Sequence, residues 1–415
     1  MDIVQLTSES MKDLRHKRLN IMKGMIDGQD GTLLVLSGAF AGEQRQHHSV
    51  SYGVFSIFYE LWERFSMESW SYTFDSEGLI FYIKLEEEAQ KVKEILVHYE
   101  DYHPLGFAID SDVFSKDGIV SRVDIGFKER IDLFTKLPLV EVLNDVVKDS
   151  KYKTDFVKRV ESEVIQGDKQ TILANILLYS YVGAFTKPLG FGMYGPNYRG
   201  SNDQMNFERF IHLLRAYKLE TANIFNYNSK RIDDVIQFQN KVQDRIAHTV
   251  LNQQSYKYTV IMTSLVLFGF RNSRGYADIS KQVKTLALEL EGRNVFDKDG
   301  DRYEITKTGF RELFNYTVPF YNKNHSVEPT FLYLISRQKD MSILTHNGEQ
   351  SLLKVQFLAK NLMLKPDKWI EMNKFCTSSY IYPHDTSHLL AVVIMLDLMQ
   401  RNYLKIKMMF EKNNQ

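Results

Sequence analysis

The sequence is poor in the features that mark secreted, nucleic-acid-binding and membrane-spanning proteins. Cys376 is the one cysteine in 415 residues, which excludes an internal disulfide and favours a reducing compartment. Lysine plus arginine equals aspartate plus glutamate at 52 each, so the charge balance indicates neither nucleic acid nor a membrane surface as a partner. These absences predict a cytoplasmic protein.

Long apolar runs are also missing. The longest, residues 258–270 and 389–399, are too short to span a bilayer, and each predicts a buried helix instead. The stretch 1–18 alternates apolar and charged residues without the apolar segment of a signal peptide, so no signal peptide is expected. The length exceeds that of one average core, which predicts two domains.

The first part of the chain mixes helix and strand patterns. Apolar residues recur at helical spacing in residues 10–26, 50–65 and 86–99, and strand-like runs cover 32–40, 70–75 and 79–85. From about residue 138 helical periodicity takes over, with a polar boundary region between residues 149 and 168. The patterns predict an α+β domain over residues 1–150, followed by an all-α helical domain over residues 168–415.

Residues 103–124 predict a β-hairpin with polar residues on one face. Asp110 and Asp112 alternate along the first strand, so their side chains project from the same face about 6 to 7 Å apart. A three-residue loop at 116–118 places Asp124 opposite Asp110 and Arg122 opposite Asp112. A two-residue loop would place Asp124 among apolar residues, and the cost of burying a lone carboxylate favours the first register.

Three carboxylates and an arginine on one face suit phosphate transfer. Asp110 and Asp112 are candidate Mg²⁺ ligands, and Arg122 is suited to bidentate phosphate binding. His103 and Gly106 add a titratable ring and a flexible turn just before the strand. The alternative is a solvated outer face of a hairpin, because Asp-x-Asp pairs are common by chance.

Three ordered segments of the first domain carry a resemblance to a known family. They are Arg15-x-x-Arg18, the apolar strand leading to Gly42-Glu43-Gln44-Arg45, and the run from His103-Pro104-Leu105-Gly106 through Asp110-Ser111-Asp112-Val113 to Ser121-Arg122-Val123-Asp124. Together they resemble the citrate lyase holo-acyl-carrier-protein synthase family. The resemblance implies transfer of a phosphoribosyl-dephospho-CoA group from its triphosphate onto a serine of the citrate lyase acyl carrier (gamma) subunit, with release of pyrophosphate.

The resemblance also implies roles for individual residues. Asp110 and Asp112 would coordinate Mg²⁺ bridging the triphosphate, Asp124 would be a third ligand or the base, and His103 joins them as a catalytic candidate. The expected substrate-binding residues of this domain are Arg15, Arg18, Arg45, Gly106 and Arg122. Arg15 and Arg18, one helical turn apart, also have the simpler interpretation of a surface basic pair.

Segments of the second domain resemble a second family. They include Thr186-Lys187-Pro188, Ser255-Tyr256-Lys257-Tyr258, the segment beginning at Asp340, and Pro383-His384-Asp385-Thr386-Ser387-His388. They are similar to triphosphoribosyl-dephospho-CoA synthase, which makes the donor from ATP and dephospho-CoA with loss of adenine. The resemblance implies a fusion of the two enzymes, with Lys187, Lys257 and Asp340 as substrate-binding residues. The family's glycines are replaced by His384 and Asp385.

Two other functions stay open on the sequence. In the first alternative, the second domain or the whole protein is a non-catalytic carrier-binding or assembly factor of citrate lyase. In the second, the first domain is a nucleotidyltransferase that acts on another acceptor, because the same carboxylate chemistry serves both.

Overall fold

The structure is a computed structural model that describes residues 19–26, 31–40, 45–75, 78–144, 150–185, 203–227, 231–247, 254–296, 302–365 and 369–411. These residues form two units that divide between Glu163 and Val164. The first has a sheet with helices and the second is helical, which confirms the predicted fold class of α+β followed by all-α.

The α+β unit is built on a five-stranded antiparallel sheet in the order β2-β3-β1-β4-β5. The strands are β1 (Thr32–Gly38), β2 (Met67–Asp75), β3 (Gly78–Leu85), β4 (Ile109–Ser115) and β5 (Gly118–Val120). The apolar run of β1 suits a strand buried at the centre of a sheet. Its Leu34 pairs with Ile83 of β3 on one side and with Val113 of β4 on the other.

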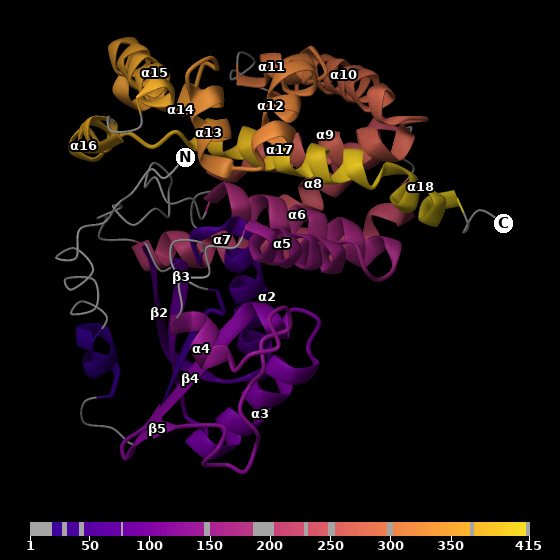
Figure 1. The fold of residues 1–415 in the computed structure, drawn as a ribbon. Helices are drawn as coiled ribbons and strands as arrows, with labels where there is room; N and C mark the ends of the chain where they lie inside the picture. Colours follow the sequence, from indigo (N-terminus) through magenta and orange to yellow (C-terminus); the bar gives the residue numbers. More distant parts are fainter. Residues whose placement is uncertain are drawn as a thin grey trace. The chain divides into compact units, whose positions relative to one another are not determined.

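One face of this sheet packs against α2 (His48–Arg64) and α3 (Ala89–Tyr102), as Figure 1 shows. Phe58 of α2 stacks on Phe81 of β3 with ring centroids 3.8 Å apart. On β4 the residues that turn to these helices are Ile109, Ser111 and Val113, all buried. Asp110 and Asp112 therefore lie on the opposite face, because successive side chains of a strand alternate.

The opposite face is covered in part by residues 19–26, which form a short helix. Ile21, Met22, Met25 and Ile26 of that helix pack against a cluster on the sheet formed by Leu33, Ile80 and Tyr82. Val35 and Phe114 pack against the same cluster. This apolar contact lies beside the aspartates, because Val35 is the cross-strand partner of Asp112.

A tight 3-10 turn, Gly106–Ala108, leads from α3 into β4. A Cβ atom at Gly106 would lie 2.2 Å from the carbonyl oxygen of Tyr99 and 2.7 Å from that of Glu100. These are backbone atoms at the end of α3, which cannot move aside as a flexible side chain would. The close approach of the turn to α3 is therefore a structural reason for glycine at this position.

Helices α4 (Leu139–Asn144) and α5 (Ser150–Val164) complete the unit. Phe156 of α5 packs edge-on against Phe40 and Phe107, with centroids 4.6 Å and 5.4 Å apart. Phe134 packs against Phe107 and Phe156 as well. This aromatic cluster joins α5 to the turn that precedes β4.

The helical unit is arranged around α17 (His384–Arg401), whose residues from His384 to Met399 are all buried. A helix that is buried all round belongs to the core of a helical domain. The other helices are α6 (Lys169–Phe185), α7 (Asp203–Asn223), α8 (Ile232–Ala247), α9 (Gln254–Asn272), α10 (Tyr276–Gly292), α11 (Glu304–Lys307), α12 (Val318–Asn324), α13 (Val327–Ile335), α14 (Met341–Asn347), α15 (Glu349–Leu364), α16 (Trp369–Ser378) and α18 (Tyr403–Glu411).

The two longest apolar runs are both buried helices, as predicted. Residues 258–270 lie in α9 and residues 389–399 in α17, and every residue of both runs is buried. Among the described residues, no helix has both the length and the apolar character needed to cross a membrane.

Candidate functional site

Asp110 and Asp112 lie side by side on the face of β4 away from α2 and α3, as the sequence predicts. Burial, and then Glu100, raises the pKa of Asp110 above its usual value. Asp112 has an open side, yet the surrounding protein and then Asp110 raise its pKa to about 6. Ionising both neighbouring carboxylates is unfavourable, and a bound cation would lower that free-energy cost.

Two arginines stand beside this pair. Arg130 donates to the carbonyl oxygens of Gly106 (2.7 Å) and Ile109 (2.5 Å), and its charge lowers the pKa of Asp110. Arg45 donates through Nε to the carbonyl oxygen of Phe40, and its charge lowers the pKa of both aspartates. Arg45 therefore lies near the carboxylate pair, and its role in substrate binding stays a prediction. Arg130 was not predicted.

A buried polar network lies behind the aspartates, on the helix-covered face. Lys93 Nζ donates to the carbonyl oxygen of Ser111 at 2.5 Å and lies 3.9 Å from Glu100 Oε1. The Ser111 hydroxyl donates to Glu100, and Arg122 lies 3.1 Å from the other oxygen of Glu100. The network joins α3 to β4, so it fixes the strand that carries Asp110.

The predicted register of the hairpin is wrong. Val113 pairs with Val120 and Ser115 with Gly118, which leaves a two-residue turn where three residues were expected. β5 ends at Val120, and Asp124 lies in the following turn, exposed, where it accepts hydrogen bonds from the Ser121 amide (2.9 Å) and hydroxyl (2.6 Å). Asp124 is therefore not opposite Asp110, and its local hydrogen bonds lower its pKa.

Arg122 is likewise not opposite Asp112. Its Nη2 donates to both carboxylate oxygens of Asp101 of α3, at 2.9 and 2.8 Å, while its Nη1 contacts Glu100. The cross-strand partners on the aspartate face are Ser37 for Asp110 and Val35 for Asp112, both on β1.

His103 and Gly106 have structural roles in the turn before β4. His103 Nδ1 accepts from the Leu105 amide at 3.1 Å, so the proton is on Nε2, which lies 3.2 Å from Glu60 Oε1. Gly106 packs against the end of α3 and accepts from Arg130. Their catalytic and substrate-binding roles stay predictions.

Three predicted substrate-binding residues, Arg15, Arg18 and Lys187, lie outside the described residues. Asp340 is buried, caps the N-terminus of α14 through the Ile343 amide (3.1 Å), and accepts from the amide (2.9 Å) and hydroxyl (2.7 Å) of Thr386. Burial and Asp385 raise the pKa of Asp340 to about 7. Lys257 lies half-buried in α9.

Three of the segments that carry the resemblance in the helical unit lie close together. Tyr258 of α9 lies with its ring centroid 5.9 Å from that of His388, and the Arg302 guanidinium lies 4.6 Å from the Tyr258 ring. Arg302 also pairs with Asp385, next to the Thr386 that Asp340 binds. Buried polar side chains from these segments thus cluster at the start of α17.

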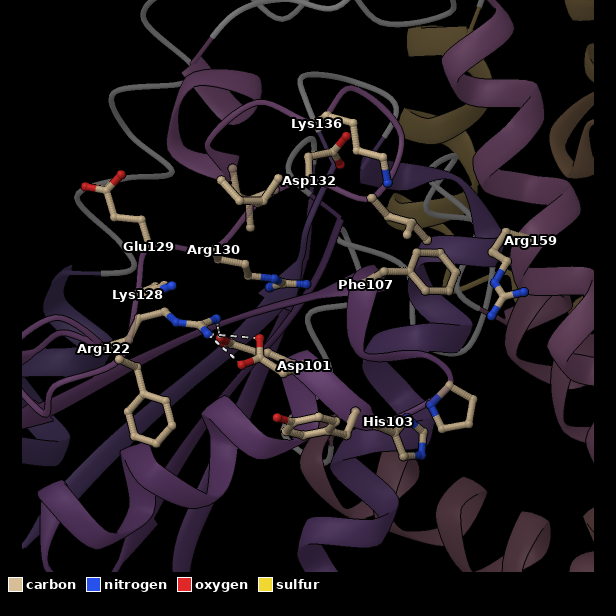
Figure 2. Close-up of a pocket in the computed structure, with 17 residues that line it drawn as sticks. Asp101, His103, Phe107, Arg122, Lys128, Glu129, Arg130, Asp132, Lys136 and Arg159 are labelled. Carbon is tan, nitrogen blue, oxygen red and sulfur yellow. Dashed lines mark hydrogen bonds and ion pairs between the residues drawn. The ribbon is translucent and has the colours of Figure 1, made fainter.

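A pocket of about 760 Å³ opens in the α+β unit beside the turn before β4, as Figure 2 shows. Asp110 and Asp112 are not among the residues that line it, although Arg130 is. Because Arg130 also lies next to Asp110, it connects the pocket with the carboxylate pair. Within the described residues, no group of three or more His, Cys, Asp or Glu side chains is positioned to hold a metal ion.

Arg130, Lys93 and Glu100 were missed in the sequence for physical reasons. Arg130 lies in a segment without regular structure, and its guanidinium donates to main-chain carbonyl oxygens. Lys93 and Glu100 lie seven residues apart on α3, a spacing that puts them on one helix face, but their charge would ordinarily place them in solvent. The helical spacing of the two charges was the available signal.

A pair of carboxylates flanked by two arginines on one face of a sheet is chemically suited to phosphate groups and a divalent cation. Residues 6–133 match the family model of apo-citrate lyase phosphoribosyl-dephospho-CoA transferase. The matched stretch contains all five strands and ends before α4. Comparison with curated proteins gives no match.

The ion pairs of Arg122 predict a stability effect. Arg122→Ala removes the cation nearest to the buried Glu100, at 3.1 Å against 3.9 Å for Lys93, so the free energy of unfolding of the α+β unit should fall by about 3 kcal/mol. Asp101→Ala removes a more exposed partner and should cost at most about 1 kcal/mol.

Urea unfolding can be followed in a Trp369→Phe background, where the remaining tryptophans, Trp62 and Trp70, both report on the α+β unit. Equal, small losses for Arg122→Ala and Asp101→Ala would contradict the view that the buried Glu100 carboxylate depends on the charge of Arg122.

Proposed function

We propose that the α+β unit transfers a phosphoribosyl-dephospho-CoA group from its triphosphate onto a serine of the citrate lyase acyl carrier subunit, with release of pyrophosphate. The observation that carries this proposal is the Asp110–Asp112 pair with Arg45 and Arg130 beside it, inside the stretch that matches the transferase family. The proposed identities of the acceptor and the donor rest on the description of that family and on the sequence resemblance.

The carboxylate pair fits a Mg²⁺ ion. Magnesium in phosphate-transfer sites is held by one or two carboxylates together with substrate phosphates. Burial, and then a neighbouring carboxylate, raises the pKa of both aspartates, so a bound cation would favour their ionised form. Asp110 and Asp112 would hold the ion, which when bound neutralises charge on the phosphate oxygens.

The chemistry of the transfer sets the tasks of the protein side chains. The serine oxygen forms a bond to the α-phosphorus of the donor, the bond between that phosphorus and the bridging oxygen breaks, and pyrophosphate leaves. Arg45 and Arg130 are suited to holding phosphate oxygens as the charge moves to the leaving group. The serine proton passes to a carboxylate oxygen of Asp112, which is the more exposed of the two aspartates.

Replacing both aspartates should abolish the transfer. We expect the Asp110→Asn, Asp112→Asn double variant to lose at least about 100-fold in rate, because it removes both cation ligands and the base together. The assay mixes the full chain with apo carrier, donor and Mg²⁺, and measures the mass gained by the carrier together with released pyrophosphate.

Asp124→Asn is the matched control, since Asp124 lies in an exposed turn and binds Ser121. It should keep most of the transfer activity. If the double variant transferred as fast as the wild type, or if Asp124→Asn lost as much as the double variant, the assignment of the site to β4 would be wrong.

For the helical unit we propose synthesis of the donor from ATP and dephospho-CoA. The support is that three of its resembling segments, at Tyr258, Asp340 and 383–388, meet at the start of α17. Their buried charges, Arg302 with Asp385 and Asp340 with Thr386, form a polar interior of the kind that binds a charged ligand.

Adenine release tests this second activity. The purified chain, incubated with ATP and dephospho-CoA, should release adenine, and Arg302→Met should lower that rate by about 10-fold or more by removing the partner of Asp385. Arg337→Met, which removes an arginine that lies over the Tyr333 ring, is the control. Carrier binding without Mg²⁺-dependent transfer and without adenine release would instead favour a carrier-binding or assembly factor.

A further inference from the structure

The pocket of about 760 Å³ in the α+β unit is not explained by the carboxylate pair alone. Its volume lies within the range of small-molecule sites, about 300 to 1,000 Å³. We propose that it binds the nucleoside diphosphate part of dephospho-CoA, while Asp110 and Asp112 act on the triphosphate arm. This inference rests on the proposed transferase function, because it divides one donor between two neighbouring sites.

Several cationic side chains of the pocket are suited to the diphosphate. Lys128, Lys136 and Arg159 line it together with Arg130. In Figure 2, Lys136 and Arg159 lie on the side where Phe107 stands, and Lys128 lies on the other side with Arg122. Cations on two sides of one cavity can contact a bound phosphate group from both of those sides.

The acidic groups of the pocket wall are largely occupied by the protein itself. Asp132 is buried and accepts hydrogen bonds from the Thr135 amide (2.6 Å) and hydroxyl (2.8 Å) and from the Tyr152 hydroxyl (2.8 Å). Asp101 is held by Arg122. Glu129 points away from the other labelled side chains in Figure 2. These contacts leave little carboxylate charge directed at an anionic ligand.

The loop that carries Lys136 is held in one conformation. Lys136 has a φ of 62°, in the left-handed region that residues other than glycine seldom adopt. The loop is closed by hydrogen bonds from the Asp132 amide to Leu137 (2.8 Å) and from the Lys136 amide to Asp132 (3.1 Å), and by the bridge between Ile131 and Pro138. Local strain of this kind is found where a side chain is positioned for function.

Aromatic side chains at the pocket provide a surface for a base. Phe127 is 42% exposed and Tyr102 is 75% exposed, and both line the cavity. Phe107 is fixed by Phe134 and Phe156, with the Arg159 guanidinium 6.0 Å from its ring centroid. Large exposed rings beside cationic groups are the combination that binds bases and phosphates together.

Binding of dephospho-CoA to the full chain tests the proposal. Isothermal titration without Mg²⁺, with every protein carrying Arg302→Met to weaken the proposed synthase site of the helical unit, measures the nucleotide site without transfer. Lys128→Ala with Lys136→Ala should weaken binding at least tenfold, which corresponds to about 1.4 kcal/mol. Lys153→Ala with Lys158→Ala removes two exposed charges from α5 outside the pocket, and should leave the affinity within about twofold.

Competitors identify the chemistry that is recognised. ADP should displace dephospho-CoA and 4′-phosphopantetheine should not, and Phe127→Ala should weaken ADP binding. Equal competition by both compounds would overturn the assignment to a nucleoside. Wild-type affinity in the Lys128, Lys136 double variant, or no binding of dephospho-CoA to the wild type at millimolar concentration, would overturn the pocket itself.

The Asp110→Asn, Asp112→Asn double variant distinguishes a failure of this inference from a failure of the proposed function. Because dephospho-CoA lacks the triphosphate arm, the variant should bind it with wild-type affinity while its transfer activity is lost. Loss of dephospho-CoA binding in this variant would contradict a separate nucleotide pocket. Absence of transfer by the wild type with pocket-dependent binding retained would overturn the transferase proposal alone.

Discussion

Removal of two neighbouring carboxylates from water is the constraint around which the polar face of the α+β unit is arranged. Asp110 and Asp112 share a face of β4, and burial together with neighbouring acidic groups raises the pKa of both. Arg45 and Arg130 offset part of this cost, and Lys93 contributes from the other side of the strand. The partly desolvated negative charge that makes the pair unfavourable alone makes it suited to a cation.

Many contacts of the unit position this pair. The register between β1 and β4 sets the aspartates opposite Ser37 and Val35, and the Lys93–Ser111–Glu100 network fastens β4 to α3. Arg130 ties the turn at Gly106 to the start of the strand and lines the adjacent pocket. Arg130 therefore contributes to both the polar face and the pocket.

The sequence predicted the fold class, the positions of β1 to β4 and the common face of Asp110 and Asp112, because these follow from alternation and apolar runs. It misplaced Asp124, because Val123 and Ile125 continue an alternating pattern although Val123 is 58% exposed in a turn. Arg130 could not be predicted, since its partners are carbonyl groups brought near only by the folded turn.

The position of the cation tests the central claim most directly. A crystal of the full chain soaked with Mn²⁺ and the triphosphate donor should give an anomalous scattering peak between the carboxylates of Asp110 and Asp112, with phosphate oxygens completing its coordination. A donor bound elsewhere with its metal ion, and no peak at these two aspartates, would contradict the account.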